Sequence, residues 1–126
     1  MIDFRRTIPI LRIFDAGKAK EFYVGFLGLA IDWEHRFDEG SPAYIQVTRG
    51  EFTLHLSEHH GDCCPGSTVF IWMEGIEDFH REINSKGNGF MRSGIEETFY
   101  GARSVPVIDP FGNRIRFDER LPLGGV

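Results

Sequence analysis

The chain has 126 residues, of which 41% are apolar, and this is enough for a single domain with its own core. Its net charge of −5, from 14 basic and 19 acidic residues, argues against a nucleic-acid-binding protein, which needs a basic surface. No apolar run reaches the roughly 18 residues of a membrane span, and no apolar stretch follows Arg5 and Arg6 as in a secretory signal. We therefore expect a cytoplasmic protein without nucleic-acid or membrane partners.

The first half of the chain predicts a strand, a helix and three further strands. Apolar and β-branched residues indicate a strand over 7–14, and Asp15 then stands where a helix N-cap is expected. Apolar side chains at helical spacing predict a helix over 16–27, which Gly28 would end. Three more strands are expected at 30–37, 43–48 and 52–57.

The second half repeats this order after a polar loop over 58–66. We expect a strand over 68–73, a helix over 75–86, a weak strand around 90–93, and strands over 102–108 and 114–118. The repeat predicts one α+β domain, residues 1–126, made of two tandem βαβββ modules at about 5–58 and 67–120. The curved sheets of such modules can enclose a cleft.

Two motifs identify a family that the chain resembles. Residues 21–29 read Glu-Phe-Tyr-Val-Gly-Phe-Leu-Gly-Leu, and residues 109–114 read Asp-Pro-Phe-Gly-Asn-Arg, a tight turn between two strands. Inside a βαβββ repeat, these motifs resemble the first-helix signature and the last turn of the vicinal oxygen chelate superfamily. That superfamily includes glyoxalase I, extradiol dioxygenases, fosfomycin resistance enzymes and bleomycin resistance proteins. The resemblance implies the two-module fold and a dimer.

The resemblance is strongest to the bleomycin resistance proteins. Residues 7–11 resemble their first strand, in which a proline equivalent to Pro9 serves as the hinge for exchanging that strand between two subunits. Residues 64–78 resemble the start of their second half. Residues 97–103 resemble a Pro-Trp-Gly-Arg stretch, with Phe-Tyr in place of Pro-Trp. Strand exchange is thus one arrangement that the resemblance allows.

The resemblance also implies where a metal ion would be held. Metalloenzymes of the superfamily place His, Gln or Glu at four strand positions, which correspond here to Ile8, His55, Val69 and Arg116. Only His55 has a suitable donor atom, and Arg116 would repel a cation. We therefore expect a member without a metal, a cofactor or a catalytic residue. A site in which His55 joins the loop histidines or a glutamate stays open as an alternative.

Three residues are expected to bind a ligand because of their place in the family pattern. Asp32 and Trp33 match an acidic–aromatic pair that contacts the ligand in bleomycin resistance proteins, and Tyr100 keeps an aromatic ring in the altered stretch. Trp33 and Tyr100 would stack on a planar heteroaromatic group, and Asp32 would meet a cationic one.

Three further candidates follow from strand alternation and charge. His55 and Ser57 share one face of the strand over 52–57, and the resemblance implies that this face lines the cleft. Arg116 in the cleft would favour an anionic or carbonyl ligand. Tyr44 and Gln46, which alternate on the preceding strand, are weaker candidates for polar contacts.

The resemblance favours a protein that binds a small molecule without transforming it. We expect a homodimer whose cleft sequesters a bleomycin-like drug or an aromatic metabolite, in antibiotic resistance or detoxification. One alternative is a metal-dependent lyase or dioxygenase of the glyoxalase type with a rearranged site. Another is a structural or regulatory dimer without a small ligand. Whether the protein is an enzyme is not decided by the sequence, which favours a non-catalytic role.

Overall fold

Two four-stranded sheets form the framework of the molecule. The computed structural model describes residues 1–86 and 94–122. The first sheet has the order β1-β4-β3-β2 and the second the order β5-β8-β7-β6. Pairs β1–β4 and β5–β8 are parallel, and the remaining pairs are antiparallel. The strands are β1 (Ile10–Arg12), β2 (Ala30–His35), β3 (Tyr44–Arg49), β4 (Phe52–Ser57), β5 (Thr68–Trp72), β6 (Glu96–Glu97), β7 (Ala102–Ile108) and β8 (Arg114–Arg120).

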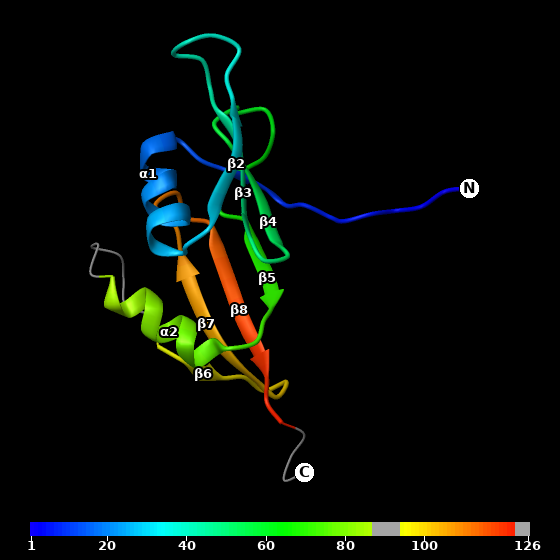
Figure 1. Cartoon of the computed structure of the whole chain (residues 1–126), viewed down its shortest axis with the longest axis vertical. Coiled ribbons are helices and arrows are strands. Elements are labelled where there is room, and N and C mark those ends of the chain that lie inside the picture. The colour runs from blue at the N-terminus through cyan, green and yellow to red at the C-terminus, as the bar shows by residue number, and fades with distance from the viewer. Residues whose placement is uncertain (87–93, 123–126) are drawn as a thin grey trace.

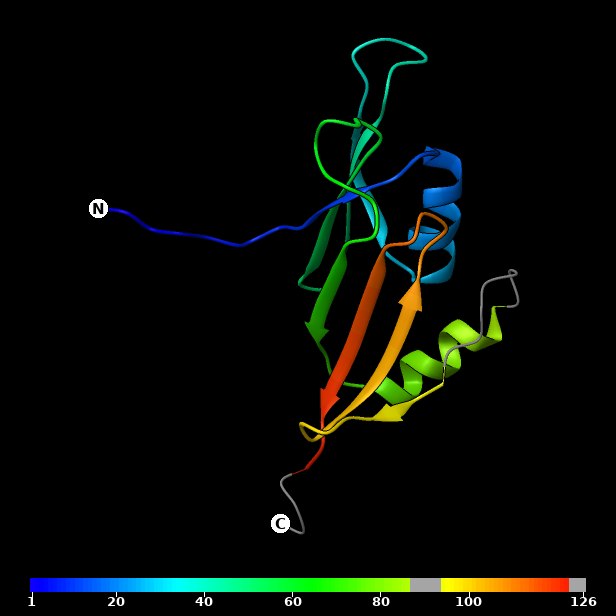
Figure 2. The same cartoon turned by 180° about the vertical axis from the view of Figure 1, so that it is seen from behind.

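The helices lie on one side of both sheets (Figures 1 and 2). They are α1 (Ala16–Lys20), which continues directly into the π-helical segment η1 (Glu21–Phe26), and α2 (Ile76–Ser85). Asp15 caps α1, since its Oδ1 accepts a hydrogen bond of 3.0 Å from the Lys18 amide. The α+β architecture of two βαβββ repeats agrees with the expected fold class. None of the described helices is long and apolar enough to cross a membrane.

The N-terminal strand is shorter than the expected 7–14. Only Ile10–Arg12 forms β1, and the residues before it make an extended arm that leaves the body on the side opposite the helices (Figures 1 and 2). Pro9 explains the boundary, because it has no amide hydrogen to continue a strand ladder. Its carbonyl still accepts a hydrogen bond of 3.0 Å from the His55 amide.

Other expected elements are found with small changes of boundary. The helix expected over 16–27 is found over 16–26, and its second part is π-helical: the Leu27 amide donates to the Phe22 carbonyl, five residues back, at 2.9 Å. Gly28 ends it at φ +78°. The weak strand expected around 90–93 lies outside the described residues, and the short β6 is found instead at Glu96–Glu97.

The core lies between the helices and the sheets. Apolar side chains of α1, η1 and α2 pack on the inward-facing side chains of both sheets, in a single cluster. Its largest fully buried members are Leu11, Ile13, Phe22, Tyr23, Leu27, Ile45, Leu54, Leu56, Ile76, Ile83 and Ile115. The same alternation that buries one face of each strand leaves the opposite face free of helices.

The turn between β7 and β8 joins the two halves of the molecule. The Asp109 carboxylate accepts hydrogen bonds from the Phe111 and Asn113 amides, both at 2.8 Å, which close the turn. It also accepts one of 2.6 Å from the hydroxyl of Tyr23, on η1. The fully buried Asn113 amide group donates to the Arg12 carbonyl of β1 at 2.8 Å. The turn motif therefore anchors the second half to the first.

Candidate functional site

Each sheet has an open face, the one turned away from the helices (Figures 1 and 2). On β4, Leu54 and Leu56 point into the core, so Thr53, His55 and Ser57 belong to the open face. We call this side of sheet β1-β4-β3-β2 the first open face. The corresponding side of sheet β5-β8-β7-β6 is the second open face.

A bulge in β2 brings two neighbouring residues onto the first open face. Ile31 pairs with Val47 and Trp33 pairs with Gln46, so Asp32 is an extra residue on the β2 side of the ladder. Strict alternation would send Asp32 and Trp33 to opposite faces. Because of the bulge, both side chains instead contact residues of the same open face.

An aromatic cluster occupies the middle of the first open face. The rings of Trp33 and Tyr44 are stacked, with centroids 5.9 Å apart and planes inclined by 9°. His55 packs edge-on against both, with centroids 5.4 Å from Trp33 and 5.1 Å from Tyr44. Trp33 is 42% exposed, so one side of this cluster is open to a ligand.

A continuous chain of hydrogen bonds runs beneath the cluster. His55 Nδ1 is 2.8 Å from the Tyr44 hydroxyl, and His55 Nε2 is 2.9 Å from Gln46 Oε1. Gln46 Nε2 donates to an Asp32 carboxylate oxygen at 2.9 Å, and the Thr48 hydroxyl donates to the same oxygen at 2.5 Å. Since the Gln46 amide nitrogen faces Asp32, its oxygen must accept from His55 Nε2, and His55 Nδ1 accepts from Tyr44.

Burial and hydrogen bonding set the charges of His55 and Asp32 in this hydrogen-bond chain. Burial lowers the pKa of His55, which keeps the imidazole neutral near pH 7. The hydrogen bonds from Thr48 and then Gln46 lower the pKa of Asp32, which keeps the carboxylate ionised. The first open face thus presents a neutral aromatic surface beside the ionised Asp32 carboxylate, with the Arg6 guanidinium close to that carboxylate.

The same hydrogen bonds bear on the alternative metal site. Both ring nitrogens of His55 are occupied, so the imidazole would have to give up a bond to Tyr44 or Gln46 before coordinating an ion. His59, on the following loop, lies beside Tyr44 with ring centroids 6.5 Å apart. Over residues 1–86 and 94–122, no group of three or more His, Cys, Asp or Glu side chains is placed to hold a metal ion.

Ser57 lies at the covered end of the first open face. Its side chain is fully buried, and its hydroxyl donates to Asp62 at 2.5 Å and accepts from the His59 amide at 3.1 Å. The loop after β4 therefore covers Ser57, and a ligand would reach this hydroxyl only if the loop moved.

The second open face carries three half-exposed aromatic side chains. Phe70, Trp72 and Tyr100 are 42%, 44% and 39% exposed, and the rings of Phe70 and Trp72 are in edge contact at 4.9 Å. Two arginines of β8 accompany them. The Arg120 guanidinium lies 4.3 Å from the Trp72 ring centroid, and that of Arg116 lies 5.9 Å from the Phe70 centroid.

A buried carboxylate lies beneath these side chains. The Tyr100 hydroxyl donates to Asp118 and accepts a hydrogen bond of 2.9 Å from Arg116. The bond to Asp118 raises the pKa of Tyr100. The other Asp118 oxygen and the hydroxyl of Ser104, which faces Asp118 across β7 and β8, are buried without a hydrogen-bond partner among the described residues.

A hollow of about 320 Å³ opens on this face beside Ser104. Arg114 and Arg116 line it together with one carboxylate, Glu96 of β6, and with Pro106 and Ile108 of β7. Two guanidinium groups beside an apolar strand suit the carboxylate or carbonyl end of a ligand.

The candidate residues fall into two groups. Asp32, Trp33 and His55 meet in the cluster of the first open face, whereas Tyr100 and Arg116 meet on the second. Within the described part of the chain, no hydrogen bond or ring contact links the two groups.

Sequence reasoning missed the contributions of Phe70, Trp72 and Asp118. The alternation of Phe70 and Trp72 with apolar core residues was visible in the sequence. Its meaning depends on the parallel pairing of β5 with β8, which sets Phe70 beside Arg116 and Trp72 beside Asp118. Tyr44 and Gln46, which seemed weaker candidates, are central to the first open face.

Comparisons with known proteins agree with this architecture. A family model described as glyoxalase superfamily protein matches residues 1–124. No curated protein matches the chain. A bleomycin-binding protein complexed with bleomycin is 20% identical, with a TM-score of 0.73, over 93% of this chain and 99% of the other.

Two further solved structures are similar. The bleomycin-binding protein of Streptomyces verticillus, complexed with copper(II)-bleomycin, is 23% identical over 98% of this chain and 100% of the other, with a TM-score of 0.70. An antibiotic-binding protein from a Streptomyces species is 16% identical over 95% of this chain and 99% of the other, with a TM-score of 0.73. At these identities the likeness establishes a shared fold.

Proposed function

Because the chain belongs to the glyoxalase superfamily, we propose that it binds a small aromatic molecule reversibly between two copies of itself, in the manner of a bleomycin resistance protein. The observation that carries this proposal is the pairing of exposed aromatic side chains with ordered polar groups on both open faces. On the first face these groups are the Trp33–Tyr44–His55 cluster and Asp32. On the second they are the aromatic side chains beside Arg116.

The two faces suit the two sides of one cleft. Exposed aromatic patches on a single copy favour association, because covering them removes apolar area from water. In a two-fold dimer, the first open face of each copy would oppose the second open face of its partner, and two equivalent clefts would form. The ionised Asp32 of one copy would then lie across from the arginines of β8 of the other.

The proposed ligand is a planar heteroaromatic compound with polar ends. Stacking between Trp33 on one wall and Trp72 or Tyr100 on the other would hold the ring system. A cationic group would approach Asp32, and a carboxylate or carbonyl group would approach Arg116. A bleomycin-like drug and an aromatic metabolite both fit this description.

The proposed action is sequestration. His55 serves the hydrogen-bond chain through both ring nitrogens, so it supports the shape of the cleft. The protein protects by mass action, which requires a low dissociation constant and protein in excess of the toxic compound. In this role it works in antibiotic resistance or detoxification.

The test is a calorimetric titration of the purified protein with metal-free bleomycin, together with metal analysis of the freshly purified protein. We expect measurable binding, weakened at least fivefold by Trp33→Ala and by Trp72→Ala, since a stacking contact with one ring is worth about 1–3 kcal/mol. Phe37→Ala is the matched control, because Phe37 is an exposed aromatic residue in the loop after β2, where its ring contacts His35 and not the Trp33–Tyr44–His55 cluster. Equal losses of bleomycin affinity in all three variants would overturn the proposed site.

Stoichiometric metal in the purified protein would count against sequestration. If that metal were lost on His55→Ala, the function would be that of a metal-dependent lyase or dioxygenase. The titration with bleomycin could give no heat while a planar aromatic carboxylate or amine binds. That result would support the cleft as a binding site and exclude bleomycin as its ligand.

A further inference from the structure

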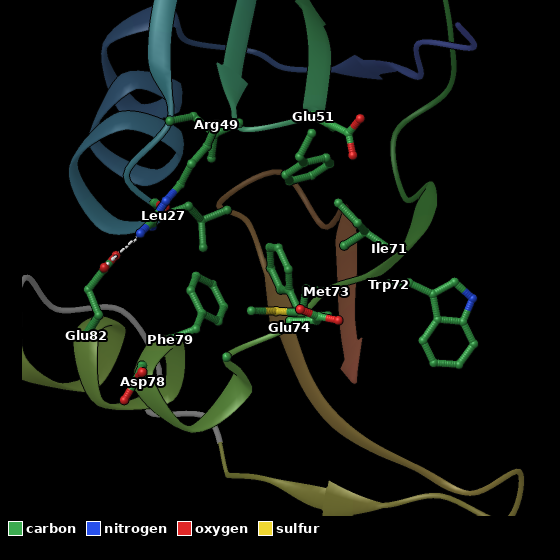
Figure 3. A pocket seen from close by; sticks show the side chains of 14 residues that line it. Leu27, Arg49, Glu51, Ile71, Trp72, Met73, Glu74, Asp78, Phe79 and Glu82 are labelled. Carbon is green, nitrogen blue, oxygen red and sulfur yellow. Dashed lines mark hydrogen bonds and ion pairs between the residues drawn. The ribbon is translucent and has the colours of Figure 1, made fainter. Parts of the chain in front are cut away.

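A second cavity lies between the two halves of the molecule, next to the second open face. It has a volume of about 460 Å³, within the range of small-molecule sites. The turn between β3 and β4 contributes one wall, with Arg49 and Glu51, and the end of β5 with the beginning of α2 contributes the other (Figure 3). Trp72 of the second open face lines one edge of it, whereas Trp33, His55, Tyr100 and Arg116 do not line it.

The floor of this cavity is apolar and largely aromatic. Phe79 of α2 and Phe117 of β8 are nearly buried, and their ring centroids are 4.6 Å apart. Phe52 meets Phe117 edge-on at 5.7 Å. Leu27 and Met73 complete the floor (Figure 3). Such a surface accommodates the flat hydrocarbon part of a ligand.

The rim of the cavity is negatively charged. Four carboxylates lie around it, against one guanidinium: Glu51, Glu74, Asp78, Glu82 and Arg49. Arg49 is already paired, because its two terminal nitrogens donate to the two Glu82 oxygens at 2.7 and 2.9 Å. It therefore offers no charge to an anionic ligand.

Two rim carboxylates, Glu51 and Glu74, are not held in an ion pair with any described residue, although Arg120 lines the adjoining hollow with them. Among the described residues, no ion pair is formed by Glu51 or Glu74, whereas Asp78 pairs with Arg81 at the surface. In Figure 3 the carboxylate of Glu51 lies at the upper rim and that of Glu74 at the lower rim. An unpaired carboxylate beside an apolar floor attracts a cation, since nearby low-dielectric atoms strengthen the interaction.

We propose that this cavity is a second small-molecule site, separate from the first open face and adjoining the second at Trp72, which binds an aromatic compound bearing a protonated amine. The ring occupies the floor formed by Phe52, Phe79 and Phe117. The ammonium group lies between Glu51 and Glu74. Because one wall belongs to each half of the chain, a bound molecule also holds the two halves together and raises the free energy of unfolding.

The probes for this site are naphthylmethylamine and naphthylacetate. They share a ring system and carry opposite charges at neutral pH, so they separate charge recognition from ring burial. We follow both by nuclear magnetic resonance, using backbone amide shifts of Gly50 and Gly75 for the cavity and of His55 for the first open face. We expect the amine to shift Gly50 and Gly75 at lower concentration than the acetate.

Two variants test the site directly. Glu51→Gln with Glu74→Gln weakens amine binding by about tenfold and leaves acetate binding unchanged or improved. Asp38→Asn with Glu39→Gln is the matched control, because it removes the same charge from a loop outside the cavity. Ile71→Trp fills the cavity and abolishes the Gly75 shift.

The outcomes separate this proposal from the proposed function. Equal affinity for both probes, an unchanged affinity in the Glu51/Glu74 variant, or shifts confined to His55 would each overturn the second site. Loss of bleomycin binding in Trp33→Ala with unchanged amine binding supports two independent sites. If Ile71→Trp fails to fold, the Glu51/Glu74 pair still decides the result.

Discussion

At the scale of single residues, His55 shows how a histidine can line a cleft without being a ligand of a metal. Its ring is held between Tyr44 and Gln46, and the aromatic face of Trp33 packs against it. The hydrogen-bond order requires a neutral imidazole, because a second ring proton would face the Tyr44 hydroxyl hydrogen. Burial acts in the same direction, by lowering the pKa of His55.

This arrangement predicts a pH dependence with a definite sign. The pKa of His55 is lower in the folded than in the unfolded protein, so the folded state binds fewer protons between the two values. The contribution of His55 to the free energy of unfolding is fully present above about pH 6.5, the ordinary pKa of histidine. It is lost as the pH falls through the folded-state pKa. Magnetic resonance titration of the His55 ring in folded and in urea-unfolded protein should give a lower midpoint in the folded form. An equal or higher folded-state midpoint would refute the hydrogen-bond order.

At the scale of elements, the β2 bulge determines what the first open face can bind. Without the extra residue, Trp33 would still pair with Gln46 and stack on Tyr44, but no carboxylate would lie beside it. The bulge therefore adds a negative charge to an otherwise regular aromatic strand face.

Two single-residue deletions should separate these roles. Deletion of Asp32 restores a regular ladder, so we expect a melting temperature within a few degrees of the parent and a loss of affinity for cationic ligands. Deletion of Glu34, two residues later in the regular part of β2, shifts the register and turns the adjoining side chains to the wrong face. The Glu34 deletion should lower the melting temperature far more. Equal melting temperatures in a thermal unfolding experiment would mean that Asp32 is not an extra residue.

The sequence predicted the elements more fully than the site, for identifiable reasons. Alternation correctly assigned the two faces of β4, and Asp15 caps α1 as expected, because both signals are local. The bulge at Asp32 arises from pairing with β3, and no local pattern marks it. The neighbourhood of Trp72 and Asp118 likewise depends on contacts between segments far apart in the chain.

At the scale of the whole molecule, the N-terminal arm (residues 1–9) carries apolar side chains that a single copy does not bury. Met1, Ile2 and Phe4 are exposed, and the arm is held to the first sheet by the Arg6–Thr53 hydrogen bond of 3.1 Å and the Pro9 carbonyl. Exposed apolar residues on an extended segment suit contact with a second copy. The proposed dimer would place this arm against its partner.

Removal of residues 1–8 tests this role of the arm. We expect the truncated protein to dimerise at least tenfold more weakly than the full chain in sedimentation equilibrium, because the apolar arm residues no longer contribute buried area. Asp3→Asn with Arg5→Gln is the control, since it changes the arm's polar residues and leaves its apolar side chains in place. Identical dissociation constants for the truncated and full-length proteins would exclude a contribution of the arm to association.

The turn over 109–113 also affects how the protein folds during its synthesis on the ribosome. Tyr23 and Arg12 find their hydrogen-bond partners 86 and 101 residues further along the chain. The first half therefore lacks these two hydrogen bonds until nearly the whole polypeptide has left the exit tunnel. Its native structure is completed only when the β7–β8 hairpin forms. A nascent chain that stalls before residue 109 leaves apolar side chains of the first half exposed, and exposed apolar surface is what chaperones bind.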